Sequence, residues 1–490
     1  MMMLPDDTIA AIATPLGEGG LAVVRLSGAL ALAVTDRCFQ PLGQSAQKVS
    51  AAPTHTLHYG KIVRQGRVVD EVLVAVMRAP RTYTREHVVE ISCHGGLLVA
   101  KTVLDTLLES GARLALPGEF TQRAFLNGRL DLAQAEAVAD LIHARTELAL
   151  TAANEQLAGK LSQRINQLRD DLVKTLAHIE AHIDFPDEDI APDTKAQLLA
   201  RLRDGVAFMD QLLATANEGQ LLRRGIRAAI IGRPNVGKSS LLNHLLGHDR
   251  AIVSPIPGTT RDTIEETANI RGLPVVFIDT AGLREGGDAI ESEGIRRSRV
   301  ALDRAELVLH VLDSSEPLTP ADEGYLREFA ERKHILVCNK TDLPRKLDLF
   351  SRREKAQTGK AVSGRWKAET PPSLLTSAPT EGENTAPVVE VSCATGQGIE
   401  ALKDAIKKLI WSGDIRAEML QVMINSRHQD ALKRARAGTL QTIEALAADH
   451  SLELAAVDLR IAVNAVGEVV GKTTTEDLLD SIFSQFCIGK

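Results

Sequence analysis

Aromatic residues are scarce in this sequence, since Phe, Trp and Tyr together make up only 3% of 490 residues. Strands of β-sandwiches are rich in aromatic and β-branched side chains, so this scarcity, beside abundant Ala and Leu, argues against an all-β fold. Cysteines are few, odd in number and without Cys-x-x-Cys spacing: Cys38, Cys93, Cys338, Cys393 and Cys487. Neither a disulfide framework nor a zinc site is indicated.

Targeting segments and long apolar runs are missing as well. The N-terminus lacks the basic start and apolar core of a signal peptide, and no apolar run approaches the ~20 residues that span a bilayer. The formal net charge is −7, so no overall positive field attracts nucleic acid, and RNA contact would need a local patch or a partner protein. We expect a cytoplasmic protein that does not associate with membranes.

The first 125 residues have a mixed α/β pattern. Short β-branched runs at Ala22–Leu26, Val72–Met77 and Val88–Ser92 predict strands, and Leu97–Glu109 has the spacing of a helix. A chain of 490 residues is too long for one hydrophobic core, so this segment is expected to be one of two or three domains.

Helical patterns dominate from about residue 126, on both sides of a central segment. Pro186 ends the first long helix. We predict a discontinuous helical domain over 126–223 and 413–490, interrupted by an inserted domain at 224–412; three domains in series are the alternative. The predicted helices are Leu161–Ile183, Thr194–Leu222, Ile415–Ala447, Leu452–Val470 and Thr475–Gln485.

A phosphate-binding loop is predicted within the inserted segment. Gly232-Arg-Pro-Asn-Val-Gly-Lys-Ser239 matches GxxxxGK[ST] between a strand-like run, Ala228–Ile231, and a helical run, Ser239–Leu246. The glycines let backbone N–H groups surround phosphates at a helix N-terminus. Lys238 should contact the β- and γ-phosphates, and the Ser239 hydroxyl should bind Mg²⁺.

Three further motifs follow in the order of a Ras-like G domain. Asp279-Thr-Ala-Gly282 supplies a carboxylate that can reach Mg²⁺ through water. In Asn339-Lys-Thr-Asp342 the carboxylate accepts two N–H groups of guanine, a pairing that adenine cannot offer, so GTP is selected over ATP. Ser392-Cys-Ala394 matches the loop behind the base. These motifs predict a GTPase.

These motifs do not supply a residue that positions the attacking water. Leu283 stands where Ras-like GTPases carry a glutamine, and its side chain cannot form a hydrogen bond. Glu291 is a candidate for this role, with an ordinary solvated acid as the alternative. Thr259 and Thr260 are candidates for closing on Mg²⁺ and the γ-phosphate, or belong to an ordinary Thr-rich loop. Residues 345–387, polar and rich in Ser, Thr and Pro, predict a flexible insertion.

Beyond the G motifs, the chain resembles the bacterial MnmE (TrmE) family of tRNA-modification GTPases over nearly its whole length. The resemblance implies a mixed α/β N-terminal domain, residues 1–125, that binds folate and dimerises, besides the interrupted helical domain and a Ras-like P-loop G domain. It rests on Asp7-Thr-Ile-Ala-Ala-Ile-Ala-Thr-Pro15, the stretch from Gly19 to Gly28, Pro117-Gly-Glu-Phe-Thr-Gln-Arg-Ala-Phe-Leu-Asn-Gly128, Leu130-Asp-Leu-Ala-Gln-Ala-Glu-Ala-Val-Ala-Asp140 and Phe486-Cys-Ile-Gly-Lys490.

The resemblance also implies an activity. With a partner, MnmG, in a heterotetramer or larger complex, the homodimeric GTPase would install a carboxymethylaminomethyl or aminomethyl group at carbon 5 of the wobble uridine of certain tRNAs. The one-carbon unit would come from 5-formyltetrahydrofolate or a related tetrahydrofolate. GTP turnover would be stimulated by K⁺, which takes the place of an arginine finger when two G domains pair.

Residue roles follow from the same resemblance. K⁺ would contact Asn235, Thr259 and the backbone carbonyls of Ser254 and Ile256, Mg²⁺ would be held by Ser239 and Thr260, and Glu291 would orient the water. Pro255 replaces an Asp common in the family and is expected to stiffen its loop. The implied GTP-binding residues are Asn235, Val236, Gly237, Lys238, Ser239, Ser240, Ser254, Pro255, Ile256, Pro257, Gly258, Thr259, Thr260, Asp279, Thr280, Ala281, Gly282, Asn339, Lys340, Thr341, Asp342, Ser392, Cys393 and Ala394.

The implied folate contacts are Arg25, Glu90, Arg129 and Lys490. Arg129 stands where Lys is common, which keeps the charge and changes the geometry. Cys487 would act in tRNA modification rather than GTP hydrolysis, with a small buried residue as the bland alternative.

A rival function is an RNA-binding switch in ribosome assembly, like the Era and Der GTPases. Era-like proteins carry a KH domain with a GxxG clamp. The last 80 residues here are helical, near neutral and lack such a loop, which favours the tRNA-modifying enzyme.

Overall fold

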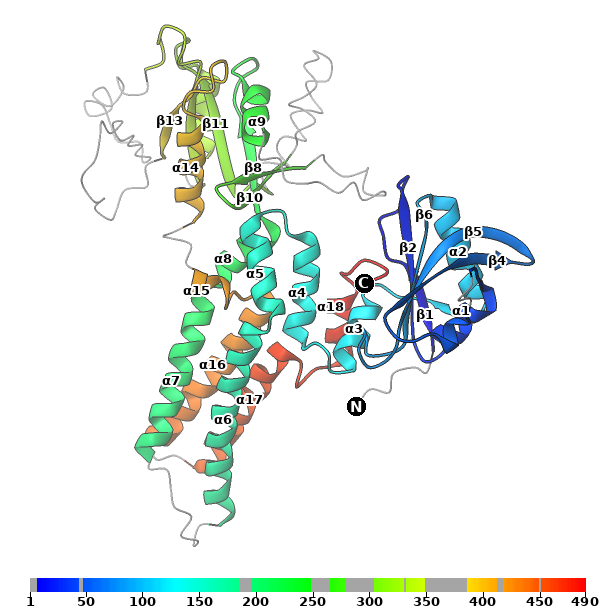
Figure 1. Ribbon diagram of the computed structural model, residues 1–490. Helices are drawn as coiled ribbons and strands as arrows, with labels where there is room; N and C mark the ends of the chain where they lie inside the picture. The colour runs from blue at the N-terminus through cyan, green and yellow to red at the C-terminus, as the bar shows by residue number, and fades with distance from the viewer. Residues whose placement is uncertain are drawn as a thin grey trace. The chain divides into compact units, whose positions relative to one another are not determined.

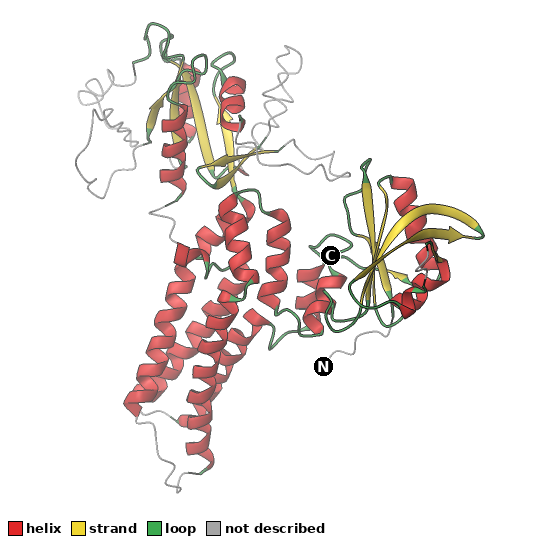
Figure 2. Ribbon diagram, in the orientation of Figure 1, coloured by secondary structure: helices red, strands yellow, loops and turns green. Residues whose placement is uncertain are grey.

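The structure is a computed structural model, shown in Figures 1 and 2, and it describes residues 7–43, 47–185, 195–247, 265–278, 304–329, 332–348, 386–411, 417–448 and 451–490. The chain folds into two compact units. Unit 1 comprises Met1–Ile142, Ala153–Ala214 and Ile424–Lys490, and unit 2 comprises His143–Ala152 and Thr215–Met423. Each unit therefore combines segments that lie far apart in the sequence.

A seven-stranded sheet forms the N-terminal part of unit 1, in the order β3-β4-β5-β6-β2-β1-β7. Its neighbouring strands are antiparallel except β1 and β7. The strands are β1 (Ile9–Ile12), β2 (Leu21–Ser27), β3 (Phe39–Pro41), β4 (Thr56–Arg64), β5 (Arg67–Met77), β6 (Val88–His94) and β7 (Arg113–Leu114). The strands predicted from β-branched runs lie within β2, β5 and β6.

Two helices, α1 (Ala31–Cys38) and α2 (Leu97–Glu109), cover one face of this sheet. Alternate residues of the central strands point into the core beneath them, as the period of two in a strand requires; Val24 and Val74 are examples. The opposite face carries Arg25, whose register partner on β6 is Glu90. The predicted helix Leu97–Glu109 is confirmed with the same bounds.

The helical part of unit 1 is built around α6, α7, α16 and α17, which lie side by side in Figure 1. The buried positions of α6 follow the apolar stripe predicted from the sequence, from Leu161 to Ile179, and α6 ends two residues before Pro186. Besides the helices described with the two sheets, the described residues form α3 (Glu119–Leu126), α4 (Leu132–His143), α5 (Glu147–Leu157), α6 (Lys160–Asp184), α7 (Lys195–Ala214), α8 (Ala216–Arg224), α15 (Ala417–Leu420), α16 (Ser426–Ala447), α17 (Leu452–Val470) and α18 (Glu476–Phe483).

Two predicted helices are each interrupted. The helix expected over Thr194–Leu222 breaks at Thr215, whose hydroxyl donates to the carbonyl of Val422, 3.3 Å away. The helix expected over Ile415–Ala447 breaks before Asn425, which has an extended backbone and caps α16 by accepting from the N–H of His428. The prediction of continuous helix was wrong at both places. Each break lies where a polar side chain bonds a backbone group, which replaces the regular helical hydrogen bonds.

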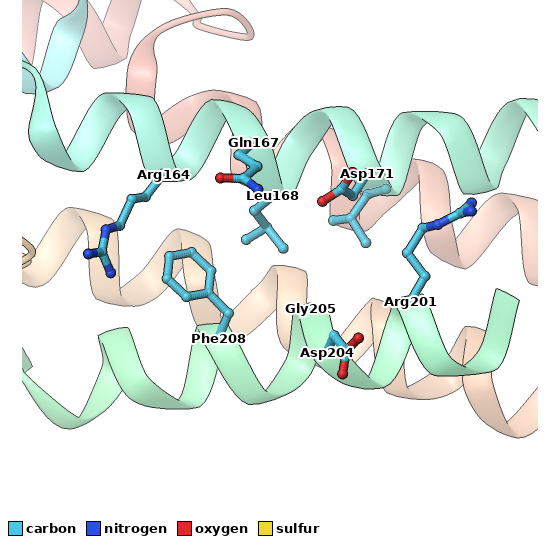
Figure 3. Close-up of a pocket in the computed structure, with 9 residues that line it drawn as sticks. Arg164, Gln167, Leu168, Asp171, Arg201, Asp204, Gly205 and Phe208 are labelled. Atoms are coloured by element: carbon cyan, nitrogen blue, oxygen red, sulfur yellow. The ribbon is translucent and has the colours of Figure 1, made fainter. Parts of the chain in front are cut away.

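A hollow lies between α6 and α7 (Figure 3), with a volume of about 320 Å³. Leu168 and Phe208 point into it from the two helices, and Gly205 leaves room for them. Two arginines and two aspartates lie around this apolar centre: Arg164, Arg201, Asp171 and Asp204. These four side chains together carry no net formal charge.

Unit 2 contains a six-stranded sheet in the order β13-β12-β11-β8-β10-β9. All its neighbours are parallel except β9 and β10, and α9 (Lys238–Leu246), α12 (Pro320–Glu328) and α14 (Ile399–Ile410) follow its strands. The strands are β8 (Ile226–Ile231), β9 (Glu266–Ile270), β10 (Leu273–Phe277), β11 (Leu307–Asp313), β12 (His334–Asn339) and β13 (Val388–Glu390). The mixed α/β and helical fold class with a P-loop G domain is confirmed.

A buried ion cluster joins α4 to α16. The Glu136 carboxylate accepts from Nε and a terminal nitrogen of Arg427 at 2.7 and 2.9 Å, and lies 2.8 Å from Nε2 of the fully buried His428. Arg427 also donates to the carbonyls of Glu468 and Val469 on α17. Burial alone would raise the pKa of Glu136, but the charges of His428 and Arg427 hold it well below the ordinary value.

Replacement of Glu136 by Gln should loosen α4 and α16, because removing one charge of a buried pair costs about 3–5 kcal/mol. We expect amide hydrogen exchange in these helices to accelerate by about two decades, measured by mass spectrometry on the full chain. Asp210→Asn is the matched control, since Asp210 pairs with Arg436 at the surface and its loss should change exchange less than about fivefold. Unchanged protection in Glu136→Gln would contradict a stabilising role for the cluster.

Candidate functional site

The predicted phosphate loop connects β8 to α9. Gly232 has φ +143°, and a Cβ there would lie 2.3 Å from the carbonyl oxygen of Val311, so only glycine fits. Asn235 has φ +62°, a left-handed conformation that is rare for a residue with a side chain. The loop therefore has the tight, strained shape that exposes backbone N–H groups at a helix N-terminus.

Lys238 is folded back onto its own loop. Its ammonium donates to the carbonyls of Gly232 and Arg233, at 2.9 and 2.7 Å. Burial lowers the pKa of Lys238, because the charged form loses hydration. The ammonium therefore lies at the loop, and its N–H groups, which now bond these two carbonyls, could instead bond the oxygens of a phosphate.

Three predicted segments meet at the carboxyl ends of β8, β12 and β13. The side-chain amide of Asn339 donates to the carbonyl of Val236, 2.8 Å away, and its oxygen accepts from the N–H of Cys393 at 3.0 Å. The Ser392 hydroxyl donates to the Asp342 carboxylate at 2.6 Å. The structure therefore brings the phosphate loop, the Asn339–Asp342 motif and the Ser392–Ala394 loop together.

Other predicted residues lie outside the described residues. These are the switch and metal candidates Ser254, Pro255, Ile256, Pro257, Gly258, Thr259 and Thr260, the motif Asp279, Thr280, Ala281 and Gly282, and the catalytic candidate Glu291. Most of the insertion predicted at 345–387 falls there too. These assignments stay predictions.

Sequence reasoning missed three side chains that contact the motifs. Arg233 pairs with Glu316 and with the buried Asp322 of α12, each at 3.0 Å. Nε2 of His244, on α9, lies 2.7 Å from the carbonyl oxygen of Cys393, to which it donates. Asp313 pairs with Lys340 at 2.6 Å. Two of them had a signal in the sequence: Arg233 belongs to the Gly232–Ser239 motif, and Asp313 ends a strand as the motif residues do.

A second group of predicted residues lies on the open face of the sheet in unit 1. Arg25 donates from Nε to Glu90 at 2.8 Å and from a terminal nitrogen to the carbonyl of Gly489 at 3.2 Å. Burial and the nearby Arg25 charge lower the pKa of Lys490. The last residues of the chain therefore reach this sheet and bring Lys490 beside Arg25 and Glu90.

Gly489 is required for this seating of the C-terminus. It has φ +97°, and a Cβ there would lie 2.5 Å from the carbonyl oxygen of Ile12. The fourth predicted folate contact, Arg129, stacks over the ring of Tyr83 at 4.9 Å, while Arg25 lies 5.7 Å from the centre of the Phe120 ring. Flat aromatic and guanidinium groups thus border the cluster.

Comparisons with known proteins agree over the whole chain. Residues 8–129 match the family described as the GTP-binding protein TrmE N-terminus, and residues 132–487 match the MnmE helical domain. The tRNA modification GTPase MnmE of Geobacillus kaustophilus is 46% identical over 491 residues, covering 100% of both chains. Its counterpart in Listeria welshimeri is 45% identical over 485 residues, covering 99% of both.

This chain belongs to the MnmE family.

Membership makes the chain a tRNA modification GTPase, which confirms the GTPase that the motifs predict and the tRNA modification that the resemblance implies. Among solved structures, the G domain of the T. maritima FeoB iron transporter is 29% identical, with a TM-score of 0.24, and covers 38% of this chain and 98% of that chain. Within the part of the chain that the structure describes, no helix has the length and apolar character of a membrane span.

The five cysteines of this MnmE-family chain differ sharply in their surroundings. Cys487 is exposed, whereas Cys38, Cys93 and Cys338 are buried and Cys393 is partly buried. Burial raises the pKa of Cys38, Cys93 and Cys393 to about 11 and that of Cys338 to about 12. The bland interpretation of Cys487 as a buried small residue is therefore wrong.

The native protein should have a single fast-reacting thiol. At pH 8 a chromogenic disulfide reagent should modify Cys487 within minutes, because the other thiols hold almost no thiolate below their raised pKa values. Cys487→Ser should remove this fast phase, and Cys393→Ser should leave it unchanged. A fast phase that survives in Cys487→Ser would show that another thiol is accessible.

Proposed function

We propose that this chain, with the partner MnmG, adds a carboxymethylaminomethyl or aminomethyl group to carbon 5 of the wobble uridine in certain tRNAs. Family membership over the full length supports the tRNA substrate, and the joined guanine-pocket segments support GTP as the energy source. The observation that carries the proposal is the contact of Asn339 with both the phosphate loop and the base loop. We also propose that the reaction takes place in the cytoplasm.

The nucleotide roles proposed for the described residues follow from their chemistry. Lys238 exchanges its two loop carbonyls for phosphate oxygens, which are stronger acceptors because they are charged. Asp342 accepts the N–H groups of guanine, while the Ser392 hydroxyl donates to one oxygen of the same carboxylate. Ser239, exposed at the start of α9, offers a hydroxyl oxygen of the kind that Mg²⁺ prefers, and Thr260 is proposed as its partner.

Hydrolysis is proposed to need a second copy of the chain and K⁺. Asn235 is exposed on the loop and offers an amide oxygen, a ligand that suits K⁺; Ser254, Ile256 and Thr259 are proposed to complete the set. K⁺ would neutralise charge that develops on the phosphates, and Glu291 would orient the water. This arrangement replaces both the glutamine and the arginine finger of Ras-like GTPases.

The open sheet face of unit 1 supports a homodimer and a folate site. Because residues paired in register share a face, Leu21, Leu57, Tyr59 and Leu73 lie on the same face as Arg25. These four apolar side chains are 41–70% exposed. Exposed apolar groups around a charged cluster are typical of an interface. We propose that a tetrahydrofolate binds beside Arg25, Glu90, Arg129 and Lys490, near Cys487.

Deletion of the gene should abolish carbon-5 modification of wobble uridines, measured by mass spectrometry of tRNA nucleosides. Cys487→Ser should leave GTP hydrolysis intact and still lack the modification. Wobble uridines that stay modified in the deletion strain, alongside a ribosome-assembly defect, would favour an Era- or Der-like function.

Glu291→Ala should lower GTP turnover by about 100-fold or more and leave GTP affinity nearly unchanged, because only the transition state uses an oriented water. Glu400→Gln, an exposed acid of α14 that pairs with Arg271, is the control and should keep full turnover. Wild-type turnover should be higher in KCl than in NaCl at equal ionic strength. Equal turnover in the two salts would remove K⁺ from the mechanism.

A further inference from the structure

Asp313 lies beside the base-recognition loop without belonging to any nucleotide motif. It is the last residue of β11, opposite Asn339 of β12 in the register of the parallel pair. Its side chain is only 4% exposed, and one carboxylate oxygen lies 2.6 Å from the ammonium of Lys340. A buried carboxylate therefore holds the second residue of the Asn339–Asp342 motif.

The rest of the Asp313 carboxylate is also bonded. Its other oxygen accepts from the N–H of Ser315 at 2.9 Å and from the Ser315 hydroxyl at 2.6 Å. Burial would raise the pKa of Asp313, but the bonds from Lys340 and Ser315 lower it below the ordinary value, so the group is charged at neutral pH. Asp313 is thus fixed in place on both sides.

Lys340 has an unusual backbone conformation. Its φ is +64°, the left-handed region that residues with a side chain rarely adopt. Its neighbours in the motif have other partners. Asn339 bonds the backbone of Val236 and Cys393, and Asp342 accepts from the Ser392 hydroxyl. The Asp313 ion pair is the contact that fixes the Lys340 side chain among the described residues.

We propose that Asp313 is a positioning residue for guanine nucleotide: it acts through Lys340 to hold the base-recognition loop in its binding shape before the nucleotide arrives. The proposal rests on the guanine site proposed above. A long lysine side chain loses much conformational freedom on ordering, and a partner that orders it beforehand improves affinity. Asp313 itself need not touch the nucleotide.

Asp313→Asn, which keeps the shape and removes the charge, should raise the Kd for GDP about tenfold. The loss should be nearly equal for GDP and IDP, because Asp313 does not read the 2-amino group that distinguishes them. Asp342→Asn should reduce the preference for GDP over IDP. Titration with fluorescent analogues of both nucleotides measures these effects.

A double-mutant cycle tests whether Asp313 acts through Lys340. In a Lys340→Ala background, Asp313→Asn should change the Kd less than about twofold, because the interaction is already absent. Additive losses would overturn the proposal. Asp404→Asn, which removes an exposed acid paired with Arg271, is the matched control and should bind GDP normally.

Further controls separate positioning from folding. Asp313→Asn should stay folded at the temperature of the titration, which circular dichroism of the nucleotide-free protein checks; if this variant does not fold, Ser315→Ala loosens the same carboxylate and should raise the Kd about threefold. A Kd unchanged in these variants, with Asp342→Asn still impaired, overturns this inference alone. Wild-type protein that shows no preference for guanine would instead overturn the proposed function.

Discussion

The hydrogen bonds of one buried amide hold the nucleotide pocket together. Asn339, 2% exposed, cannot leave its donor or acceptor unpaired without a penalty of about 1–3 kcal/mol. It satisfies both by bonding the phosphate loop at Val236 and the base loop at Cys393, which come from segments 103 and 54 residues away. The parallel order of β8, β11, β12 and β13 brings these groups to one edge of the sheet. The two hydrogen bonds of the Asn339 side chain therefore satisfy its buried polar atoms and also hold the phosphate loop against the base loop.

Unit 1 is ordered by a comparable constraint. The side chain of Glu136 is only 11% exposed, so it needs cations within reach, and Arg427 and His428 supply them from 291 and 292 positions further along the chain. Arg427 in turn binds the carbonyls of Glu468 and Val469 in the last turn of α17, where the regular helical hydrogen bonds run out. Burial of one carboxylate thereby fixes how helices from the two sides of the inserted unit pack together.

Local patterns in the sequence predict much of this. The apolar stripe predicts α6. The predicted helix Leu452–Val470 has the bounds of α17, which ends where Gly471 takes the left-handed conformation. The breaks at Thr215 and Asn425 were missed, since each depends on a side chain bonding a backbone group. In the pocket, motif spacing identifies Lys238 and Asp342, whereas the His244 and Arg233 contacts arise only when separate elements meet. Contacts between side chains of separate elements leave no periodic pattern or fixed spacing in the sequence, so they cannot be predicted from it.

The C-terminal residues around Cys487 are held in place by contacts with the sheet of unit 1. Short ends of chains are usually poorly ordered unless something binds them. Here Arg25 binds the carbonyl of Gly489 while Glu90 holds the guanidinium, and the missing Cβ of Gly489 allows its backbone to lie against Ile12. Lys490 is drawn into the same cluster, where burial and the nearby Arg25 charge lower its pKa. The seating of Gly489 thereby also brings the exposed Cys487 near Lys490 at this face of the sheet.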